Sequence, residues 1–236
     1  MNFTRNTFKS LSIIVMAYNE VDSLEIVVSE IIQALEKICP RYEIIIVDDG
    51  SSDGTSDLSD HLANTSNKIN VIHHPINRGL GGVYRTGIEN ANSDYVTFIP
   101  ADGQFPPRIL RDYLPHMYES DMIIGYIPNR RDSLSSRSLS LLEKLFYRLL
   151  FGSFPKLQGV LMFRTDLREE IKLISSGRGW AVVMELVMKA SKNGYTLLEM
   201  PNELRPRISG SSKVNNLNTV YENFKEALLL RWRLND

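Results

Sequence analysis

The stretch YEIIIVDDGSSDGT at residues 42–55 joins a run of apolar, mostly β-branched residues to an acidic turn that contains two glycines. Residues 42–47 predict a buried strand, and the turn after it ends where a helix begins at Thr55. The same alternation continues on both sides of this stretch. Further strands are predicted at residues 11–16, 70–73 and 94–99, and further helices at residues 19–37 and 79–92. Short strands that alternate with helices indicate βαβ units, so we expect an α/β fold with a mostly parallel central sheet and helices on both faces.

Length and composition are those of an ordinary globular protein. The chain has 236 residues, of which 43% are hydrophobic and 23% are charged. We expect one domain over residues 1–236, with a first half at 10–127 and an elaborated second half at 128–236. Cys39 is the only cysteine, which excludes a disulfide framework. No apolar run of about 18 residues and no secretory signal occur, so we expect a cytoplasmic protein that is soluble or peripheral to a membrane.

The charges are divided unevenly along the chain. Residues 1–127 carry 9 Lys and Arg against 17 Asp and Glu, a net charge of −8, whereas residues 128–236 carry 18 against 11, a net charge of +7. A basic half favours phosphate groups or an anionic membrane face as partners. The isoelectric point near 6.4 argues against general binding of nucleic acid, which we do not expect as a partner.

Two stretches of the basic half predict amphipathic helices. Residues 133–151 repeat leucine and phenylalanine at three- and four-residue spacing, and residues 217–234 end in ALLLRWRL, where Trp232 lies between two arginines. In one interpretation these helices lie against anionic lipid at a membrane surface. In the other they pack on the protein and expose a solvated basic face.

Carboxylates follow the predicted strands. Asp48 and Asp49 come after the second strand and Asp102 after the fourth, and the carboxyl ends of parallel strands share one edge of a sheet, where ligands bind. Asp102 and Gln104 offer two oxygen ligands of the kind that a divalent cation bound to a nucleoside diphosphate requires. An Asp-Gly-Gln turn without a metal is the alternative.

A glycine-rich stretch and a basic stretch limit the classes of ligand that the protein is expected to bind. RGLGG at residues 78–82 lacks the spacing of a dinucleotide-binding fingerprint, so a nicotinamide-dependent dehydrogenase is not expected. RPRISGSSK at residues 205–213 combines arginines, small residues and a lysine, which suits a mobile clasp for phosphate. A basic surface loop is the alternative interpretation of this stretch.

The order of these elements resembles one known family. The motifs that carry the resemblance are MAYNE, IVDDGSSDGT, NRGLGG, PADGQFPP, GWAVVMEL, EMPNELRPR and GSSK. Together they resemble glycosyltransferase family 2, which has the nucleotide-sugar-binding GT-A fold, and within it the dolichol- or polyprenyl-phosphate sugar synthases. The resemblance covers about residues 10–215. It implies an inverting transfer of a sugar from a GDP- or UDP-linked donor to a polyprenyl or dolichyl phosphate, by a peripheral enzyme on the cytoplasmic face of a membrane.

The resemblance also implies roles for particular residues. Those expected along the nucleoside are Met16, which replaces the usual proline, Tyr18, Glu20, Val47 and Asp49. Those expected at the diphosphate and at Mg²⁺ or Mn²⁺ are Ala101, Asp102 and Gln104. Arg137 is expected in the acceptor-side helix, and Arg207 and Lys213 in the clasp. Asp102, Arg207 and Lys213 are the expected catalytic residues.

Departures from the family pattern leave alternatives open. Pro100 stands where the branch usually has the first aspartate of Asp-Ala-Asp, so one metal carboxylate is missing. A lipid phosphate is already an anion and needs no general base, whereas a hydroxyl acceptor needs one; Glu185 is the residue that could act as a base, or else orient the site. The alternatives are therefore a soluble family member with a saccharide or other hydroxyl acceptor, and a non-catalytic nucleotide-sugar-binding subunit. A membrane-anchoring partner subunit is conceivable, but nothing in the sequence identifies one.

Overall fold

A computed structural model gives the fold. It describes residues 9–36, 38, 39, 41–128, 146, 148–152, 155, 157–210 and 217–233, and of 217–223 the backbone alone. Arg137, Lys213 and most of the predicted helix 133–151 lie outside the described residues. Within that helix, residues 146 and 148–151 are described and are helical, as predicted.

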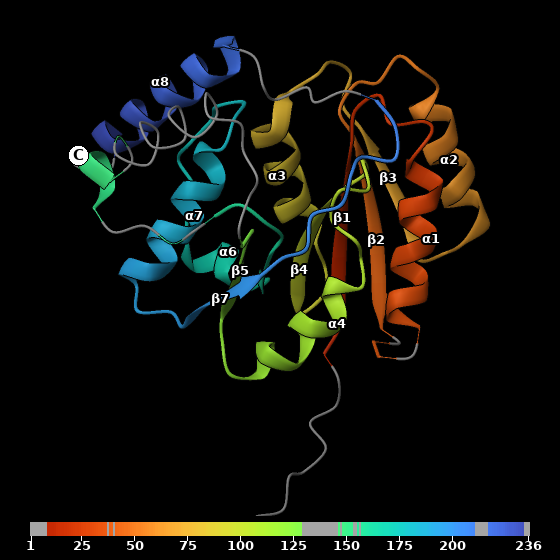
Figure 1. The fold of residues 1–236 in the computed structure, drawn as a ribbon, viewed down its shortest axis with the longest axis horizontal. Helices are drawn as coiled ribbons and strands as arrows, with labels where there is room; N and C mark the ends of the chain where they lie inside the picture. Colours follow the sequence, from red (N-terminus) through yellow and green to blue (C-terminus); the bar gives the residue numbers. More distant parts are fainter. Residues whose placement is uncertain are drawn as a thin grey trace, which may run out of the picture.

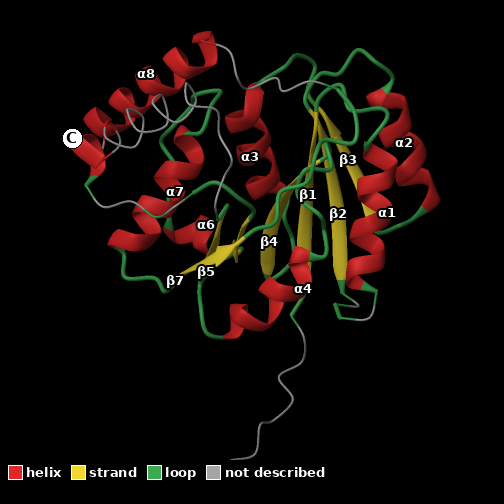
Figure 2. Cartoon of the chain, in the orientation of Figure 1, coloured by secondary structure: helices red, strands yellow, loops and turns green. Residues whose placement is uncertain are grey.

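The described strands form one mixed sheet in the order β3-β2-β1-β4-β6-β5-β7 (Figures 1 and 2). The strands are β1 Leu11–Ala17, β2 Tyr42–Asp48, β3 Ile69–His73, β4 Tyr95–Pro100, β5 Met122–Tyr126, β6 Leu161–Arg164 and β7 Leu197–Pro201. The first four run parallel, β6 is antiparallel to β4 and β5, and β7 is parallel to β5. The expectation of a mostly parallel α/β sheet is confirmed.

Helices cover both faces of this sheet (Figure 2). They are α1 Leu24–Leu35, α2 Thr55–Thr65, α3 Gly79–Asn90, α4 Ile109–Tyr113 with a 3-10 turn at Leu114–Tyr118, α6 Leu167–Glu170, α7 Ala181–Lys192 and α8 Leu217–Arg233. One apolar core lies between the sheet and α1, α2 and α4, and another lies between the sheet and α3 and α7. Alternate residues of the strands face the two cores: Ile13 and Val15 the first, Ile14 the second.

The predicted start of the first helix is wrong. The helix expected from residue 19 begins at Leu24, because Asn19 has a φ of 52° and belongs to a turn. Its N–H donates to Ser51 Oγ at 2.9 Å, and its side-chain oxygen accepts the N–H of Ser52 at 2.8 Å. A short polar side chain tolerates this left-handed conformation, and the bonds to the neighbouring turn fix it. The predicted final helix at 217–234 is confirmed as α8.

The register of the sheet brings the acidic turns together. Ala17 at the end of β1 pairs with Asp48, and Met16 pairs with Pro100. Beyond these pairs, the N–H of Asp49 donates to Ala17 O and the N–H of Ala101 donates to Met16 O, both at 2.9 Å. The turns after β2 and β4 therefore lie on either side of the turn after β1. None of the described helices has the length and apolar character needed to cross a bilayer.

Gly87 of α3 gives a test of the packing. A Cβ at this position would lie 2.8 Å from Ile14 Cγ2 and from Phe98 Cε1. In an open helix, Gly→Ala gains about 1 kcal/mol. Here we expect Gly87→Ala to lower the free energy of unfolding by about 1–3 kcal/mol because the core is overpacked. Denaturant unfolding measures the change. The added cost should fall in an Ile14→Ala background, and a more stable Gly87→Ala protein would contradict the packing.

Candidate active site

The guanidinium of Arg207 lies between two carboxylates at the carboxyl edge of the sheet. Arg207 Nη2 is 2.8 Å from Asp102 Oδ2, and Nη1 is 3.4 Å from Glu20 Oε1. Both acidic residues are nearly buried, with 7% of Asp102 and 9% of Glu20 exposed. Removing Arg207 would leave two like charges close together with little solvent, so the cation stabilises the arrangement. The structure thus brings together three residues that the sequence assigned to one site.

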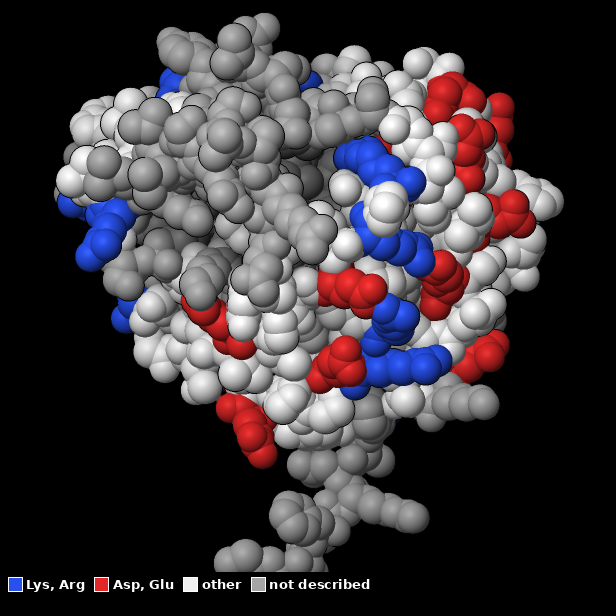
Figure 3. All heavy atoms as spheres, in the orientation of Figure 1, with Lys and Arg blue, Asp and Glu red and all other residues white. Residues whose placement is uncertain are grey.

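The segment that carries Arg207 is held along the loop that carries Asp102. The N–H of Arg205 donates to Gln104 O at 2.9 Å, and the N–H of Ile208 donates to Asp102 O at 3.1 Å. Arg205 also donates to Gly103 O and forms an ion pair with both oxygens of Glu30 on α1, at 2.9 and 2.6 Å. Backbone and side-chain bonds therefore hold residues 205–208 along the loop at residues 102–104. Figure 3 shows Lys and Arg interleaved with Asp and Glu on the face that this segment crosses in Figure 1.

The side-chain oxygens of Asp102 and Gln104 are ligands of the type that a hard divalent cation takes. Asp102 offers a carboxylate and Gln104 an amide oxygen, and both suit Mg²⁺ or Mn²⁺ when substrate phosphates supply the other ligands. Asp102 Oδ1 accepts the N–H of Gln104 at 2.9 Å, which fixes the carboxylate over the turn. Pro100 contributes no ligand, and among the described residues no group of three or more His, Cys, Asp or Glu could hold a metal by itself. Asp102 and Gln104 would therefore need further ligands, such as phosphate oxygens or water, to hold a cation.

Asp49 is buried and closes the glycine-rich turn. Its carboxylate accepts the N–H groups of Arg78 and Gly79, both at 2.8 Å, at the start of α3. A carboxylate is favourable at a helix N-terminus. His74 Nδ1 lies 2.6 Å from the same carboxylate and Nε2 lies 2.8 Å from Thr86 Oγ1, so the ring connects Asp49 to α3.

Sequence reasoning missed His74. The signal that could have found it is its position just beyond β3, at the edge that carries Asp49.

Asp48 forms a second acidic centre, in a pocket of about 330 Å³ beside α2. Burial by itself would raise the pKa of Asp48, but hydrogen bonds from Ser51, Ser56 and His73 lower it overall. The pKa of His73 is raised above 6.5, chiefly by its hydrogen bond to Asp48 at 2.9 Å; partial burial opposes the shift and Asp60 adds to it.

The remaining predicted residues fall into two groups. Val47 and Ala101 are fully buried, so their side chains lie beneath the site, whereas Met16 and Tyr18 are partly exposed at the end of β1. Glu185 is 0% exposed, and its oxygens accept the N–H groups of Ile174 and Ser175 at 2.8 and 2.7 Å. Lys189 Nζ lies 2.6 Å from Glu185 Oε1. Glu185 therefore fixes a loop, which agrees with the orienting interpretation rather than with a general base.

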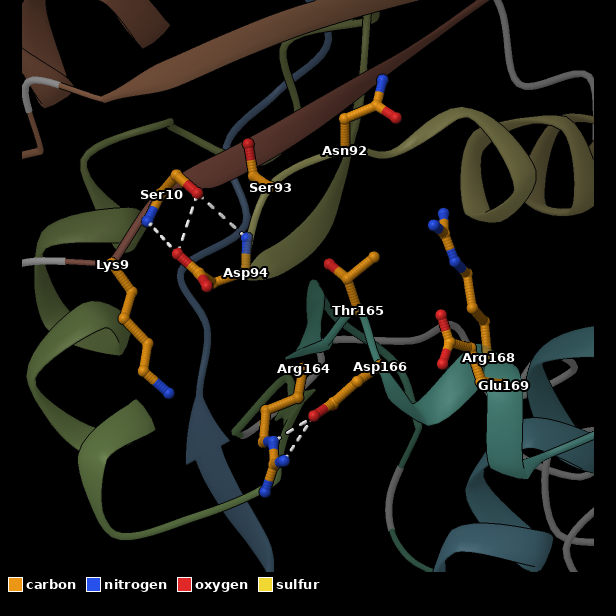
Figure 4. A pocket seen from close by; sticks show the side chains of 10 residues that line it. All are labelled: Lys9, Ser10, Asn92, Ser93, Asp94, Arg164, Thr165, Asp166, Arg168 and Glu169. Carbon is orange, nitrogen blue, oxygen red and sulfur yellow. Dashed lines mark hydrogen bonds and ion pairs between the residues drawn. The ribbon is translucent and has the colours of Figure 1, made fainter.

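The pocket in Figure 4 lies at the opposite edge of the sheet. It measures 260 Å³ and is formed where Lys9 and Ser10 precede β1, Asp94 precedes β4, and Arg164 and Asp166 lie at the end of β6. Two of its carboxylates have partners within it: Asp94 accepts the N–H and O–H groups of Ser10 at 2.8 and 2.9 Å, and Asp166 is paired with Arg164. No predicted site residue lines it, so it is not the candidate active site.

The His73–Asp48 pair predicts a pH dependence. Because the pKa of His73 is raised on folding, its contribution to stability is complete below about pH 6.5 and is lost as the pH rises through the raised value. We expect wild type to exceed His73→Gln in free energy of unfolding at about pH 6, and the difference to shrink by about pH 9. Denaturant unfolding at both pH values measures it, with exposed His61→Gln as the control. A difference independent of pH would contradict the pairing.

Comparisons with known proteins identify the family of the chain. The family model described as glycosyl transferase family 2 matches residues 12–168. The chain is 29% identical over 228 residues to polyprenol monophosphomannose synthase of Mycolicibacterium smegmatis, covering 91% of this chain and 84% of that protein. It is 27% identical to undecaprenyl-phosphate mannosyltransferase of Micrococcus luteus, covering 86% of each.

Among solved structures, glucosyl-3-phosphoglycerate synthase from Mycobacterium tuberculosis, in complex with Mn²⁺, UDP and glucosyl-3-phosphoglycerate, has a similar fold. The TM-score is 0.71 at 17% identity, covering 94% of this chain and 80% of that chain. This likeness confirms the expected GT-A type of α/β fold. Because the family model matches well over half of the chain, the protein is a glycosyltransferase and belongs to glycosyltransferase family 2.

Proposed function

We propose that the protein transfers a sugar, with inversion, from a GDP- or UDP-linked donor to a polyprenyl or dolichyl phosphate. The observation that carries this proposal is the position of Arg207, which brings positive charge to the Asp102–Gln104 loop at the sheet edge where GT-A donors bind. The names of the two relatives, which describe transfer of mannose to polyprenol and undecaprenyl phosphates, support the same acceptor class.

The chemistry requires the leaving diphosphate to be stabilised and the reactants to be positioned. Asp102 and Gln104 would hold Mg²⁺ or Mn²⁺, which supplies positive charge to the diphosphate when bound. Arg207 holds further positive charge at the same point, and Lys213 is proposed to add to it from the continuation of the segment. Met16, Tyr18, Glu20, Val47, Asp49 and Ala101 are proposed to surround the donor, and Arg137 to face the acceptor.

The state of Glu185 supports a phosphate acceptor over a hydroxyl acceptor. A hydroxyl group needs a carboxylate within hydrogen-bond reach to remove its proton, whereas a lipid phosphate attacks as an anion. Glu185, the residue that could have served as this base, is fully buried and hydrogen bonded to Ile174 and Ser175. Its position therefore favours a reaction that needs no base from this helix.

Exposed apolar and basic residues on α8 also support the proposal that the protein acts at a membrane surface. On α8, Leu228, Leu229 and Trp232 are 51%, 43% and 65% exposed, while Ala227 and Leu230 are buried against the protein. Basic residues flank this apolar face, with Arg231 and Arg233 in the last turn of the helix. Apolar and basic side chains in this arrangement suit an anionic lipid surface, and we place it on the cytoplasmic face.

A donor panel tests the proposed function. GDP- and UDP-sugars are supplied with Mg²⁺ or Mn²⁺, with and without polyprenyl phosphate in anionic vesicles. We expect lipid-dependent release of one nucleoside diphosphate and sugar-linked lipid as the product. Donor binding without stimulation by lipid would contradict the acceptor and favour a hydroxyl acceptor. Absence of donor binding would contradict the enzyme function at this site.

Asp102→Asn tests the centre of the site. The substitution keeps the shape of the side chain but removes its charge, so we expect transfer to be nearly abolished while the fold is retained. Initial rates and circular dichroism measure the two effects. Exposed Asp112→Asn on α4 is the matched control and should keep its activity. Near-normal turnover of Asp102→Asn would remove this carboxylate from the proposed role.

A further inference from the structure

Gly79 and Gly81 of the NRGLGG stretch are explained by a loop from the second half of the chain. Residues 174–179, here called the bridge loop, lie against the first turn of α3. A Cβ at Gly79 would be 2.6 Å from Arg178 O, and a Cβ at Gly81 would be 2.3 Å from Gly177 O. The N–H of Gly81 donates to Arg178 O at 2.8 Å. The glycines therefore allow close backbone contact between α3 and the bridge loop.

Charged side chains from two helices hold one end of the bridge loop. Glu185 on α7 accepts the N–H groups of Ile174 and Ser175. Arg85 on α3 donates to the carbonyl oxygens of Ser175 and Gly177, at 3.4 and 3.0 Å. Backbone groups of an irregular loop need such partners, because no helix or sheet provides them.

Glu226 of α8 holds the other end. Its carboxylate accepts the N–H of Arg178 at 2.6 Å and the N–H of Gly179 at 3.0 Å. A Cβ at Gly177 would lie 2.1 Å from the carboxyl carbon of Glu226, so this contact also requires glycine. The bridge loop is thus enclosed between α3 on one side and α8 on the other, and Figure 1 shows α8 alongside α7.

Arg178 connects the bridge loop to the candidate donor site. Its guanidinium donates to Asn77 O at 2.7 Å and to Asn77 Oδ1 at 2.6 Å. The next two residues, Arg78 and Gly79, donate their N–H groups to Asp49. Three successive sets of hydrogen bonds therefore lead from Glu226 to Asp49.

We propose that Glu226 is a positioning residue of the donor site. By fixing the N–H groups of Arg178 and Gly179, it holds the Arg178 side chain on Asn77, and so keeps the turn at residues 77–79 in the form that Asp49 binds. The affinity of the enzyme for its nucleotide then depends on a helix that contributes no residue to the proposed catalytic set. This inference rests on the proposed function, which makes Asp49 part of the nucleoside site.

Glu226→Gln tests the inference in the full chain. Glutamine keeps the size of the side chain but turns an N–H₂ group toward one of the two N–H groups. The pair of hydrogen bonds from Arg178 and Gly179 to residue 226, here called the clamp, is then lost. We expect faster amide hydrogen exchange at residues 174–180 and at residues 76–82, and a roughly tenfold weaker affinity for GDP or UDP with Mn²⁺. The turnover rate at saturating donor should change less than the affinity. Exposed Glu25→Gln on α1 is the matched control, with exchange and affinity as in wild type.

Arg178→Gln removes the hydrogen bonds between the Arg178 guanidinium and Asn77, which are the next contacts between Glu226 and Asp49. This variant tests the inference if Glu226→Gln fails to fold. We expect it to weaken nucleotide binding by a similar factor, and the double variant to bind no more weakly than either single variant. Unchanged exchange at residues 76–82 in these variants, or multiplied losses of affinity in the double variant, would overturn the inference. If wild type binds neither GDP nor UDP, the proposed function fails, and so does the expected effect on affinity. The exchange data at residues 76–82 would still show whether Glu226 fixes the turn that Asp49 binds.

Discussion

The charge balance among Arg207, Glu20 and Asp102 is the constraint on which the candidate site depends. The two carboxylates follow different strands and are nearly buried, so each needs compensation for the solvent it has lost. The compensating guanidinium comes from a segment more than a hundred residues further along the chain. Its placement requires residues 205–208 to lie along the Asp102–Gln104 loop, which the backbone bonds and the Arg205–Glu30 pair secure. Residues 205–208 of the basic second half and the acidic loops of the first half therefore meet at the sheet edge, where we propose that the leaving diphosphate is stabilised.

The carboxylates at this edge of the sheet differ in the partners that hold them. Asp102, which is nearly buried, pairs with the partly exposed Arg207 at the sheet edge. Asp49, by contrast, is tied to His74 and to the start of α3, and Glu185 is tied to the bridge loop. Buried carboxylates that accept several N–H bonds fix backbone geometry. A phosphate acceptor suits such a site, because it needs positioning and charge but no general base.

Local sequence patterns were sufficient to predict much of the structure of the first half of the chain. The apolar runs at 11–16 and 42–47 predicted β1 and β2, and the sheet-edge rule placed Asp49 and Asp102 close together. Features that depend on distant partners were not predictable. The turn at Asn19 is fixed by Ser51 and Ser52, and the antiparallel β6 arises from pairing with β4 and β5. The clamp between Glu226 and Arg178 likewise joins segments whose proximity follows from the packing of α7, α8 and α3, which no periodicity in the sequence encodes.

The most direct test of this account is a double-mutant cycle on the Arg207–Asp102 pair. The free energies of unfolding of wild type, Asp102→Asn, Arg207→Gln and the double variant are measured by denaturant titration in the absence of ligand. The account predicts that the double variant loses less stability than the two single variants together, by about 1 kcal/mol or more, because each single variant leaves a nearly buried charge without its partner. Losses that add to within about 0.5 kcal/mol would contradict it, since they would mean that the two side chains do not interact in solution.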